Sequence, residues 1–267
     1  MSSAHSPAAD GFDRVDPVAG FRENASPVLA VKADFLAGPV TPRHRHRRAQ
    51  LALLPERVLR VRTDNQLWVA APGQAVWLPP GLIHQTWSDD RPSMRSLFID
   101  PAQATMLAPK PQLLKVTPLL REIVCWLAED GADQTGSPTW CRLAESAVEL
   151  IQPLEVTAVP LPAPTSPRLM RIEDRIRAAP ALEHSIGEHA GHEAMSTRSL
   201  LRLVQTQTGM SWRQWRRVVV LSEAMPRLVA GRSVGAVASE LGFRSSGSFI
   251  TAFKEVFGRT PGRFVSG

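Results

Sequence analysis

Three histidines and one glutamine have the residue types and the spacing of a small binding site. His44 and His46 lie two residues apart, so both side chains point to one face if this segment is a strand. Gln50 keeps the same parity, and His84 follows a turn-rich stretch. Neutral imidazole is a ligand for Zn, Fe, Mn, Ni or Cu, and a glutamine carbonyl is a weaker oxygen ligand. The four residues therefore predict either a site for one divalent transition metal ion or a pocket for a small-molecule effector.

The residues around this site read as short strands separated by turns. Leu59, Val61 and Thr63 alternate with Arg60 and Arg62, a period of two that is typical of a half-buried strand. Further strands are expected at residues 67–70, 75–78 and 96–99, with Asp-Asn, Pro-Gly and Pro-Pro-Gly turn signals among them. Short strands with breaks this frequent predict a small barrel or sandwich.

Two spaced motifs cover residues 36–100 of the chain. The first has the form G-x5-H-x-H-x3,4-E, with Gln in place of Glu, and is formed by Gly38, His44, His46 and Gln50. The second has the form G-x5-P-x-G-x2-H and is formed by Gly73, Pro79, Gly81 and His84, with Ser88 where Asn is usual. These motifs resemble the cupin superfamily, in which three histidines and a glutamate bind a metal inside a barrel. The resemblance implies the same ligand set here, although the glutamine removes a charge, and a purely structural barrel stays open as an alternative.

After residue 110 the hydrophobic period changes to that of helices. Residues 119–127 and 143–151 carry apolar side chains at helical spacing, with Pro118 and Pro138 suited to first-turn positions. Two amphipathic helices beside a barrel either pack on it or form a dimer seam. The sequence leaves both arrangements open.

A proline-rich stretch divides the chain into a neutral part and a basic part. Residues 153–167 contain five prolines, which prevent a continuous helix and favour an extended, stiff spacer. Residues 1–167 carry 16 Lys and Arg against 17 Asp and Glu, whereas residues 168–267 carry 15 against 8. This basic excess indicates an anionic partner, such as nucleic acid, for the C-terminal part.

The C-terminal part contains an internal repeat. Residues 195–211 align with residues 244–260 at a constant separation of 49 residues. In each copy a serine precedes a stretch of apolar periodicity and a glycine closes it, which predicts a capped helix of about 12 residues. A shorter helix is expected before each copy, at residues 186–193 and 234–241. Helix, tight turn and helix is the helix-turn-helix arrangement, whose second helix can enter the DNA major groove.

Residues 234–261 combine the patterns A-x-x-x-G-F, F-x-x-x-F-K and F-G-x-T-P. With the repeat, they make residues 168–265 resemble the AraC/XylS family of transcription regulators, in which a cupin-like domain often precedes this module. The resemblance implies a DNA-binding regulator whose partners are double-stranded DNA and a small-molecule or metal effector. It also implies recognition helices in successive major grooves, about 34 Å apart.

By the same resemblance, Arg198 and Arg202 occupy base-contacting positions of the first recognition helix. Arginine can bond guanine O6 and N7 together. Ser199 and Gln205 are lesser candidates. The inner side of this helix is expected to be formed by Leu200, Leu201, Leu203 and Val204. The other candidates for DNA contact are Ser246, Gly247, Ile250, Thr251 and Lys254 of the second recognition helix, and Arg216 and Arg217 of the connecting helix.

Two departures from the family pattern bear on the geometry of the repeat. Position 194 is Ala where the turn usually has Gly, and Ala adopts a positive φ less easily. The connecting helix, expected at residues 212–230, contains Pro226, which should kink it. Because this helix sets the spacing of the two units, the kink bears on how they meet DNA.

Together these features predict a multidomain α and β protein with an N-terminal cupin-like β-barrel, two following helices, and a C-terminal all-α domain with two helix-turn-helix units. The expected divisions are a flexible arm (1–25), an effector-binding domain (26–110), a helical connector (111–152), a linker (153–167) and a DNA-binding domain (168–267). A homodimer and RNA polymerase are further expected partners. The chain has no long apolar run, no apolar leader and two cysteines outside any C-x-x-C, so we expect a cytoplasmic protein without membrane contact.

The alternative is a metal-dependent cupin enzyme, a dioxygenase or isomerase, with a basic C-terminal association module. Its turnover would depend on His44, His46 and His84. Two features argue against the enzyme. The metal-binding glutamate of the motif is missing, and the repeated helix-turn-helix unit is something that an enzyme does not need. The P-loop and G-x-G-x-x-G signatures are also absent from the sequence. We therefore expect a regulator, either an activator or a repressor, with no catalytic residues.

Overall fold

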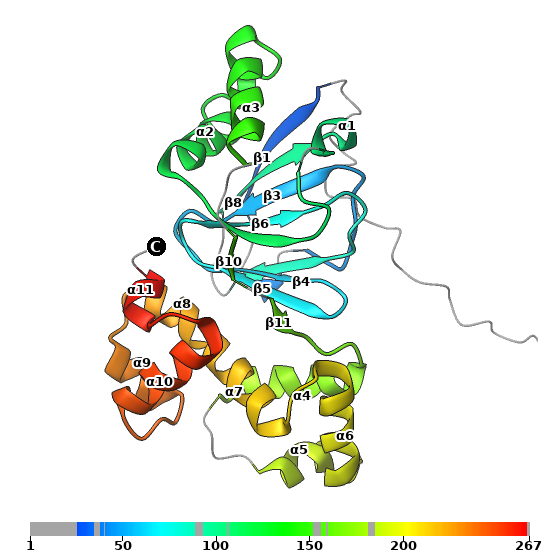
Figure 1. Cartoon of the computed structure of the whole chain (residues 1–267), viewed down its shortest axis with the longest axis vertical. Helices are drawn as coiled ribbons and strands as arrows, with labels where there is room; N and C mark the ends of the chain where they lie inside the picture. Colours follow the sequence, from blue (N-terminus) through cyan, green and yellow to red (C-terminus); the bar gives the residue numbers. More distant parts are fainter. Residues whose placement is uncertain are drawn as a thin grey trace, which may run out of the picture.

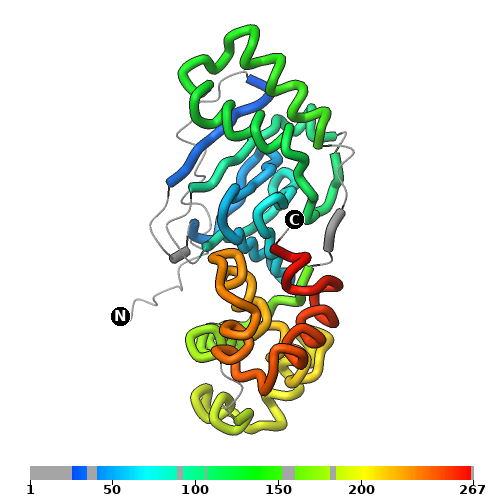
Figure 2. The backbone as a smooth tube through the Cα atoms, turned by 90° about the vertical axis from the view of Figure 1, so that its left-hand side faces the viewer, coloured from blue at the N-terminus to red at the C-terminus, as the bar shows by residue number. Residues whose placement is uncertain are grey.

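The computed structural model describes residues 26–34, 38–39, 41–88, 93–105, 107–151, 156–158, 160–180 and 185–265. The expected N-terminal arm, residues 1–25, lies outside the described residues. A β-rich domain occupies the upper half of Figure 1 and a helical domain the lower half, and Figure 2 shows the same division from the side. This architecture confirms the predicted fold class.

Two antiparallel sheets form the barrel. The six-stranded sheet has the order β1-β8-β3-β6-β9-β10. Its strands are β1 (Val28–Asp34), β8 (Ser93–Ile99), β3 (Ala49–Leu53), β6 (Gln74–Leu78), β9 (Gln112–Lys115) and β10 (Val156–Ala158). The five-stranded sheet has the order β11-β5-β4-β7-β2. Its strands are β11 (Leu161–Pro162), β5 (Gln66–Ala70), β4 (Leu59–Arg62), β7 (Gln85–Ser88) and β2 (Gly38–Pro39).

The alternation of side chains in β4 and β5 gives the five-stranded sheet two apolar faces. Leu59, Val61 and Trp68 belong to the cluster inside the barrel. Leu67 and Val69 belong instead to a cluster formed mainly by the C-terminal domain. A period of two explains this division, because neighbouring residues of a strand face opposite sides of the sheet. The outer face of this sheet is therefore an interface between the two domains.

The helices that follow the barrel pack on the outer face of the six-stranded sheet (Figure 1). They are α2 (Pro118–Ala128) and α3 (Pro138–Ile151), with the short helices α1 (Pro101–Ala104) and η2 (Ala132–Gln134) before and between them. Thr117 and Ser137 cap α2 and α3 through their side chains. Buried residues of both helices, such as Leu120 and Trp140, share one cluster with Leu51 of β3. Of the two arrangements left open by the sequence, the structure shows packing on the barrel.

The proline-rich stretch is extended, as its composition predicts, but it is not a free spacer. Strand β10 pairs with β9 of one sheet, and β11 pairs with β5 of the other. The amide of Ala163 then donates to the carbonyl of Asn65 at 3.0 Å. The chain thus stays attached to the barrel until α4 begins at Pro167.

Helices α4 to α11 form the C-terminal domain around one apolar core. They are α4 (Pro167–Ala178), α5 (Ile186–His192), α6 (Thr197–Thr208), α7 (Trp212–Ser222), α8 (Ala224–Val229), α9 (Val234–Glu240), α10 (Ser246–Phe257) and α11 (Pro261–Val265). Trp215, Phe249 and Phe253 are fully buried in this core. The aromatic spacing of α10 therefore serves packing, as expected for buried phenylalanines at helical intervals.

The connecting segment is two helices rather than one kinked helix. Helix α7 ends at Ser222 and α8 begins at Ala224, two residues before Pro226. Pro226 has no N–H to donate to the carbonyl of Ser222, so the α-helical hydrogen bond at this point is missing. That carbonyl instead accepts from the guanidinium of Arg60 at 3.4 Å. The sequence predicted a kink in one helix; the structure has a break at this point, and the carbonyl released by the proline contacts the barrel.

Candidate DNA-binding surface and effector pocket

Both copies of the repeat form a helix, a tight turn and a second helix. In the first, α5 is followed by α6, and Ser196 caps α6 by accepting from the amide of Ser199 at 3.1 Å. In the second, α9 is followed by α10, and Ser245 accepts from the amide of Ser248 at 3.2 Å. Both second helices have 12 residues and end at a left-handed glycine. The repeat thus predicted the length and the caps of both recognition helices correctly.

The turn of the first unit uses alanine in a conformation that favours glycine. Ala194 has φ of 50°, and its counterpart Gly242 in the second unit has φ of 75°. A side chain in the left-handed region costs about 1–2 kcal/mol. An ion-paired carboxylate next to this turn holds it in place, because Glu193 pairs with Arg171 at 2.6 Å and with Arg175 at 2.7 Å. Helix α4, which carries both arginines, is thereby fixed to the first helix-turn-helix unit.

The exposed face of α6 carries the expected arginines and one residue that the sequence pattern did not indicate. Arg198, Arg202 and Gln205 are exposed, and neither arginine forms an ion pair within the described residues. Ser199 is half-buried, and its hydroxyl lies 2.9 Å from that of Ser196. Leu201 was expected on the inner side, but it is 45% exposed. At 100° per residue Leu201 falls beside Arg198 and Gln205, so an apolar side chain lies within this face.

The exposed face of α10 is small and nearly uncharged. Ser246, Gly247, Thr251 and Lys254 are exposed, whereas Ile250 is half-buried against the core. Small side chains let a helix approach base edges closely, and a lysine at the end can reach a phosphate. The two recognition helices therefore differ in chemistry, with two exposed guanidinium groups on α6 and one ammonium on α10.

The two arginines expected on the connecting helix are in different positions. Arg217 of α7 is exposed and pairs with Glu255 of α10 at 3.2 Å, which ties the connecting helix to the second unit. Arg216 is half-buried, and this burial lowers the pKa of its guanidinium. Arg216 is thus less open to solvent than the exposed Arg198 and Arg202, and Arg217 is engaged in an ion pair, so both are weaker candidates for phosphate contact than Arg198 and Arg202.

The three histidines converge inside the barrel. They reach this position from an extended segment rather than from a regular strand, because His44 forms only an isolated bridge with His84. His44, His46 and His84 are all buried, and one ring nitrogen of each lies within 4.8 Å of the others. The predicted convergence of His44 and His46 with His84 is therefore present, although the strand expected to carry them is not regular.

Hydrogen bonds fix the orientation of all three rings. The Nδ1 atoms of His44, His46 and His84 lie 2.9, 2.5 and 2.9 Å from the backbone carbonyls of Pro42, Arg48 and Leu82. A carbonyl can only accept, so each Nδ1 carries a proton, and a ring in its neutral form then presents its Nε2 lone pair. The Nε2 atom of His84 is buried and has no hydrogen-bond partner among the residues that the structure describes. In metal sites, a hydrogen bond from the other ring nitrogen to a carbonyl orients the ligating histidine in this same way.

Burial keeps His84 neutral. Removal from water, together with the neighbouring His44 and His46, lowers the pKa of His84 to about 3, although the Leu82 carbonyl opposes the shift. Metal ions bind the neutral form of imidazole. Across the pH range near neutrality, His84 is therefore in the form that a metal ion or a hydrogen-bond donor from an effector requires.

Gln50 completes the site and makes an unusual contact. Its Oε1 lies 3.1 Å from Nε2 of His46, and its Nε2 donates to the hydroxyl of Ser96 at 2.9 Å. If Nδ1 of His46 carries the proton, two lone pairs face each other between His46 and Gln50. The contact is satisfied if His46 is doubly protonated, if the Gln50 amide is turned over, or if a cation binds both atoms. The four residues found from the sequence motif thus form one connected group.

A cavity of about 210 Å³ lies next to this group. His44, Gln50 and His84 line it, together with apolar residues that include Met94 and Phe98. Sites for drug-sized ligands have volumes of roughly 300–1,000 Å³. The barrel cavity therefore suits an ion with its water ligands, or a very small molecule.

A network of buried ion pairs joins the barrel to the C-terminal helical domain. From strand β4, Arg60 pairs with Glu223 at 3.2 Å and Arg62 pairs with Glu173 at 2.7 Å. Arg177 of α4 lies between the two carboxylates, 2.7 Å from Glu173 and 2.5 Å from Glu223. Burial alone would raise the pKa of Glu173, but the guanidinium groups of Arg177 and Arg62 outweigh it and lower the pKa. Arg60, placed on a half-buried strand by the sequence, is 1% exposed because the second domain covers it.

Comparison with known proteins agrees with both halves of the structure. Residues 27–155 match the family model of the AraC-like ligand binding domain, and residues 190–266 match a helix-turn-helix domain. The chain is 34% identical to the HTH-type transcriptional regulator NimR of Escherichia coli over 233 residues. The aligned region covers 87% of this chain and 84% of that protein. It is also 32% identical over 112 residues to the HTH-type transcriptional regulator RipA of Corynebacterium glutamicum, over 42% of this chain and 33% of that protein.

Two solved structures illustrate more distant similarity. Fatty acid-bound ToxT from Vibrio cholerae is 12% identical, covers 91% of this chain and 96% of its own, and superposes with a TM-score of 0.39. The C-terminal domain of AraT from Geobacillus stearothermophilus is 20% identical, covers 38% of this chain and 85% of its own, and has a TM-score of 0.34.

Proposed function

The chain belongs to the AraC family of transcription regulators, and we propose that it reads its operator through Arg198 and Arg202 of α6 under control of the histidine pocket. It is a DNA-binding regulator with a ligand-binding domain rather than a cupin enzyme. The observation that carries the assignment of residues is the exposed face of α6, where two guanidinium groups form no ion pair within the described residues. Bidentate arginine contacts to guanine are the commonest specific base contacts.

The two recognition helices have different tasks in this proposal. Arg198, Arg202 and Gln205 contact bases, with Leu201 between them on the same face and Ser199 at its edge. The shorter side chains of Ser246, Gly247, Ile250 and Thr251 read thymine methyl groups and groove shape, and Lys254 contacts phosphate. Arg216 and Arg217 contact DNA phosphates at the edge of the site. The first unit therefore contributes most of the discrimination between sequences.

The histidine pocket holds one divalent transition metal ion in this proposal, with His44, His46, His84 and Gln50 as the residues that bind it. Two observations support this fit: the Nδ1 atoms all bond to backbone carbonyls, and the Nε2 atom of His84 is buried without a hydrogen-bond partner in the described part of the chain. A bound ion supplies fixed positive charge and joins segments that are distant in sequence. The second candidate for the same pocket is a very small organic effector that donates hydrogen bonds to the histidines.

The ion-pair network between the domains connects the pocket to DNA. Arg60 and Arg62 lie on β4, which pairs with β7 directly after His84. A change at His84 that shifts β7 also shifts the two arginines that bind Glu223 and Glu173. An effector that favours one arrangement of the domains then changes DNA affinity through the different contacts of each arrangement.

A homodimer, RNA polymerase and a cytoplasmic location belong to the proposal as well. None of the described helices has the length and apolar character needed to span a membrane. Size-exclusion chromatography with light scattering tests the oligomeric state, and transcription in vitro on the selected operator gives the sign of regulation.

The test of the DNA-binding residues is a gel-shift titration on an operator found by selection from random DNA. Arg202→Ala should lower affinity for the cognate site and relax the preference at one base. Arg142→Ala, an exposed arginine of α3, is the matched control and should bind as the wild type does. Unchanged affinity and specificity in Arg202→Ala would overturn the assignment.

The test of the pocket is elemental analysis of protein prepared without a histidine tag. About one equivalent of metal per chain, lost in the double variant His44→Ala and His46→Ala, supports the metal site. Protein free of metal that still responds to an organic compound supports the second candidate instead.

A further inference from the structure

A groove lies beside the recognition helix α6, where the chain passes from the barrel into the C-terminal domain. Helix α6 contributes Arg202 and Thr206 to its lining, and the start of α4 contributes Ser166 and Arg168. Its volume of about 840 Å³ leaves room for a stretch of nucleic-acid backbone with its water. The groove therefore joins the exposed face of α6 to a segment that lies outside both helix-turn-helix units.

The charge in this groove is positive. Arg168 is exposed and forms no ion pair within the described residues. Arg202 is exposed in the same groove, and none of the described residues that line it is acidic. The carboxylate of the neighbouring turn, Glu193, is already neutralised by Arg171 and Arg175 at 2.6 and 2.7 Å. Two guanidinium groups thus line the groove without a carboxylate from its described lining to balance them.

Hydrogen bonds hold the start of α4 in place against α6. The side-chain oxygen of Gln207, on α6, accepts from the backbone amides of Thr165 and Ser166 at 3.0 Å each. The hydroxyl of Ser166 accepts from the amide of Leu169 at 3.2 Å and so caps α4. Arg168 therefore extends from backbone that is already fixed relative to α6, which reduces the ordering cost when its side chain binds a partner.

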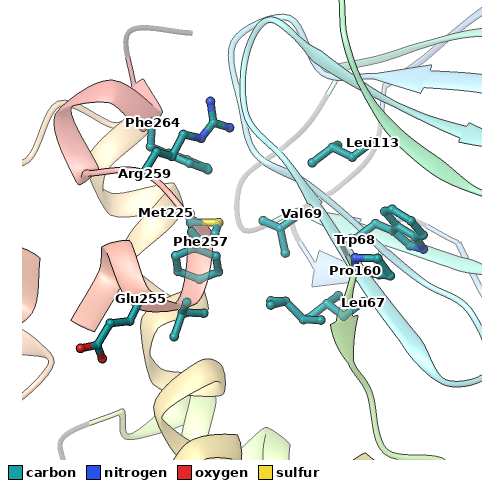
Figure 3. Close-up of a pocket in the computed structure, with 13 residues that line it drawn as sticks. Leu67, Trp68, Val69, Leu113, Pro160, Met225, Glu255, Phe257, Arg259 and Phe264 are labelled. Carbon is teal, nitrogen blue, oxygen red and sulfur yellow. The ribbon is translucent and has the colours of Figure 1, made fainter. Parts of the chain in front are cut away.

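The other end of the same segment is fixed to the barrel. Strand β11 pairs with β5, and Pro160, the residue before β11, lies with Leu67 and Trp68 on the barrel side of the domain junction (Figure 3). Residues 163–165 then connect β11 to the cap of α4. The backbone that carries Arg168 is thus positioned by the barrel and by the recognition helix together.

We propose that this groove binds the sugar-phosphate backbone of DNA beside the base that Arg202 reads, with Arg168 as a phosphate contact and Gln207 as the residue that positions it. This contact rests on the proposed function, in which α6 lies in the major groove. That groove is about 12 Å wide and is bordered by a phosphate strand on each side. A guanidinium matches a phosphate, because it donates parallel N–H bonds to two oxygens.

The contact fixes the position of the protein on DNA and carries no sequence information of its own. The end of the segment between the domains becomes a third element of the DNA-binding surface, in addition to α6 and α10. Loss of Arg168 should therefore weaken binding to every sequence, whereas loss of Arg202 should change which sequence is preferred.

The test is the salt dependence of DNA binding by the full chain, measured by fluorescence anisotropy on the selected operator and on a random duplex of the same length. Each phosphate contact contributes about 0.9 to the slope of log affinity against log salt concentration. Arg168→Gln should lower the magnitude of this slope by about 0.9 on both duplexes. Its loss of affinity should then be about 3.5-fold greater at about 50 mM salt than at about 200 mM salt. The sequence that it selects from random DNA should stay that of the wild type.

Three further variants locate the effect. Arg168→Lys keeps the charge and should keep most of the slope. Arg263→Gln, at an exposed arginine of α11 outside the groove lining, is the matched control and should keep the whole slope. Gln207→Leu releases the amides of Thr165 and Ser166 and should weaken binding to both duplexes. Combined with Arg168→Gln it should add little further loss, because the two residues act through one contact.

An unchanged slope in Arg168→Gln, or a change in the sequence that it selects, would overturn the proposal. Full additivity of Arg168→Gln and Gln207→Leu would overturn the positioning role of Gln207. Arg202→Ala separates these outcomes from failure of the proposed function. An altered base preference in Arg202→Ala with an unchanged slope in Arg168→Gln would refute the backbone contact alone, whereas a wild-type preference in Arg202→Ala would refute both.

Discussion

Glu173→Gln is the substitution that tests most sharply how the two domains are held together. Glu173 is 2% exposed and lies between Arg62 of β4 and Arg177 of α4, at 2.7 Å from each. Glutamine has nearly the same shape, so packing is kept and only the charge is lost. Removing one partner of a buried ion pair costs about 3–5 kcal/mol, because the remaining charge stays buried without compensation.

The structure places the expected cost at the lower end of this range. Arg177 keeps a second carboxylate, Glu223, whereas the only ion pair that the structure shows for Arg62 within its described residues is the one with Glu173. The side chains of Arg62 and Arg177 are 12% and 13% exposed, so water screens them little. We therefore expect Glu173→Gln to lower the free energy of unfolding by about 3 kcal/mol.

The assay is urea unfolding followed by far-UV circular dichroism and by tryptophan fluorescence, which should give coincident transitions if the domains unfold together. The control is Glu255→Gln, the same substitution at an ion pair whose side chains are 45% and 59% exposed. Exposed pairs contribute about 0–1 kcal/mol, so the control should be nearly neutral. A cost for Glu173→Gln within about 0.5 kcal/mol of the control would refute the reasoning.

The pH dependence provides an independent check of the same pair. The pKa of Glu173 is lowered in the folded state, so its stabilising effect is complete above the unfolded pKa of about 4.3 and is lost as the pH falls through the lower folded value. The stability difference between the wild type and Glu173→Gln should therefore be constant near pH 7 and shrink below about pH 4. A difference that stays the same at low pH would show that the charge is not its cause.

Four further predictions follow from individual residues. Arg202→Ala should cost about 1–3 kcal/mol at its cognate base in gel-shift titrations, with little change at non-specific DNA. Leu201→Ala should leave the unfolding free energy within about 0.5 kcal/mol of the wild type and weaken operator binding; a large loss of stability would contradict its exposed position. Ala194→Gly should stabilise the protein by about 0.5 kcal/mol in urea unfolding, whereas Gly209→Ala at φ of 69° should destabilise it by about 1 kcal/mol. Under the proposed metal assignment, His84→Ala should abolish metal retention in elemental analysis, and full retention in this variant would show that His84 is not a ligand.

Local signals in the sequence predict the parts of the fold that depend on local physics. Serine caps, closing glycines and a repeated apolar stripe are sufficient to place both recognition helices with their lengths. The histidine motif likewise brings His44, His46, Gln50 and His84 into one group, although His44 lies on an isolated bridge rather than in a strand. These features are set by residues close together in sequence or by a spacing motif.

The features that the sequence did not reveal depend on contacts between the domains. Arg60 and Arg62 alternate with apolar residues, as the solvent-facing residues of a half-buried strand do. Their side of the sheet is buried because the C-terminal domain packs against it. Leu201 follows the apolar pattern of α6 but falls one position outside the buried stripe. No periodicity can show that the proline-rich stretch adds a strand to each sheet, because that pairing joins segments distant in sequence.

The most direct test of the central claim is selection of binding sites from random DNA by the wild type, Arg198→Ala and Arg202→Ala. The wild type should select two conserved elements about one helical turn, or 34 Å, apart. Each arginine variant should lose preference within one element only and keep the other. Selection of a single element, or identical selected sequences for all three proteins, would contradict the account that α6 and α10 read successive grooves with Arg198 and Arg202 as the main base contacts.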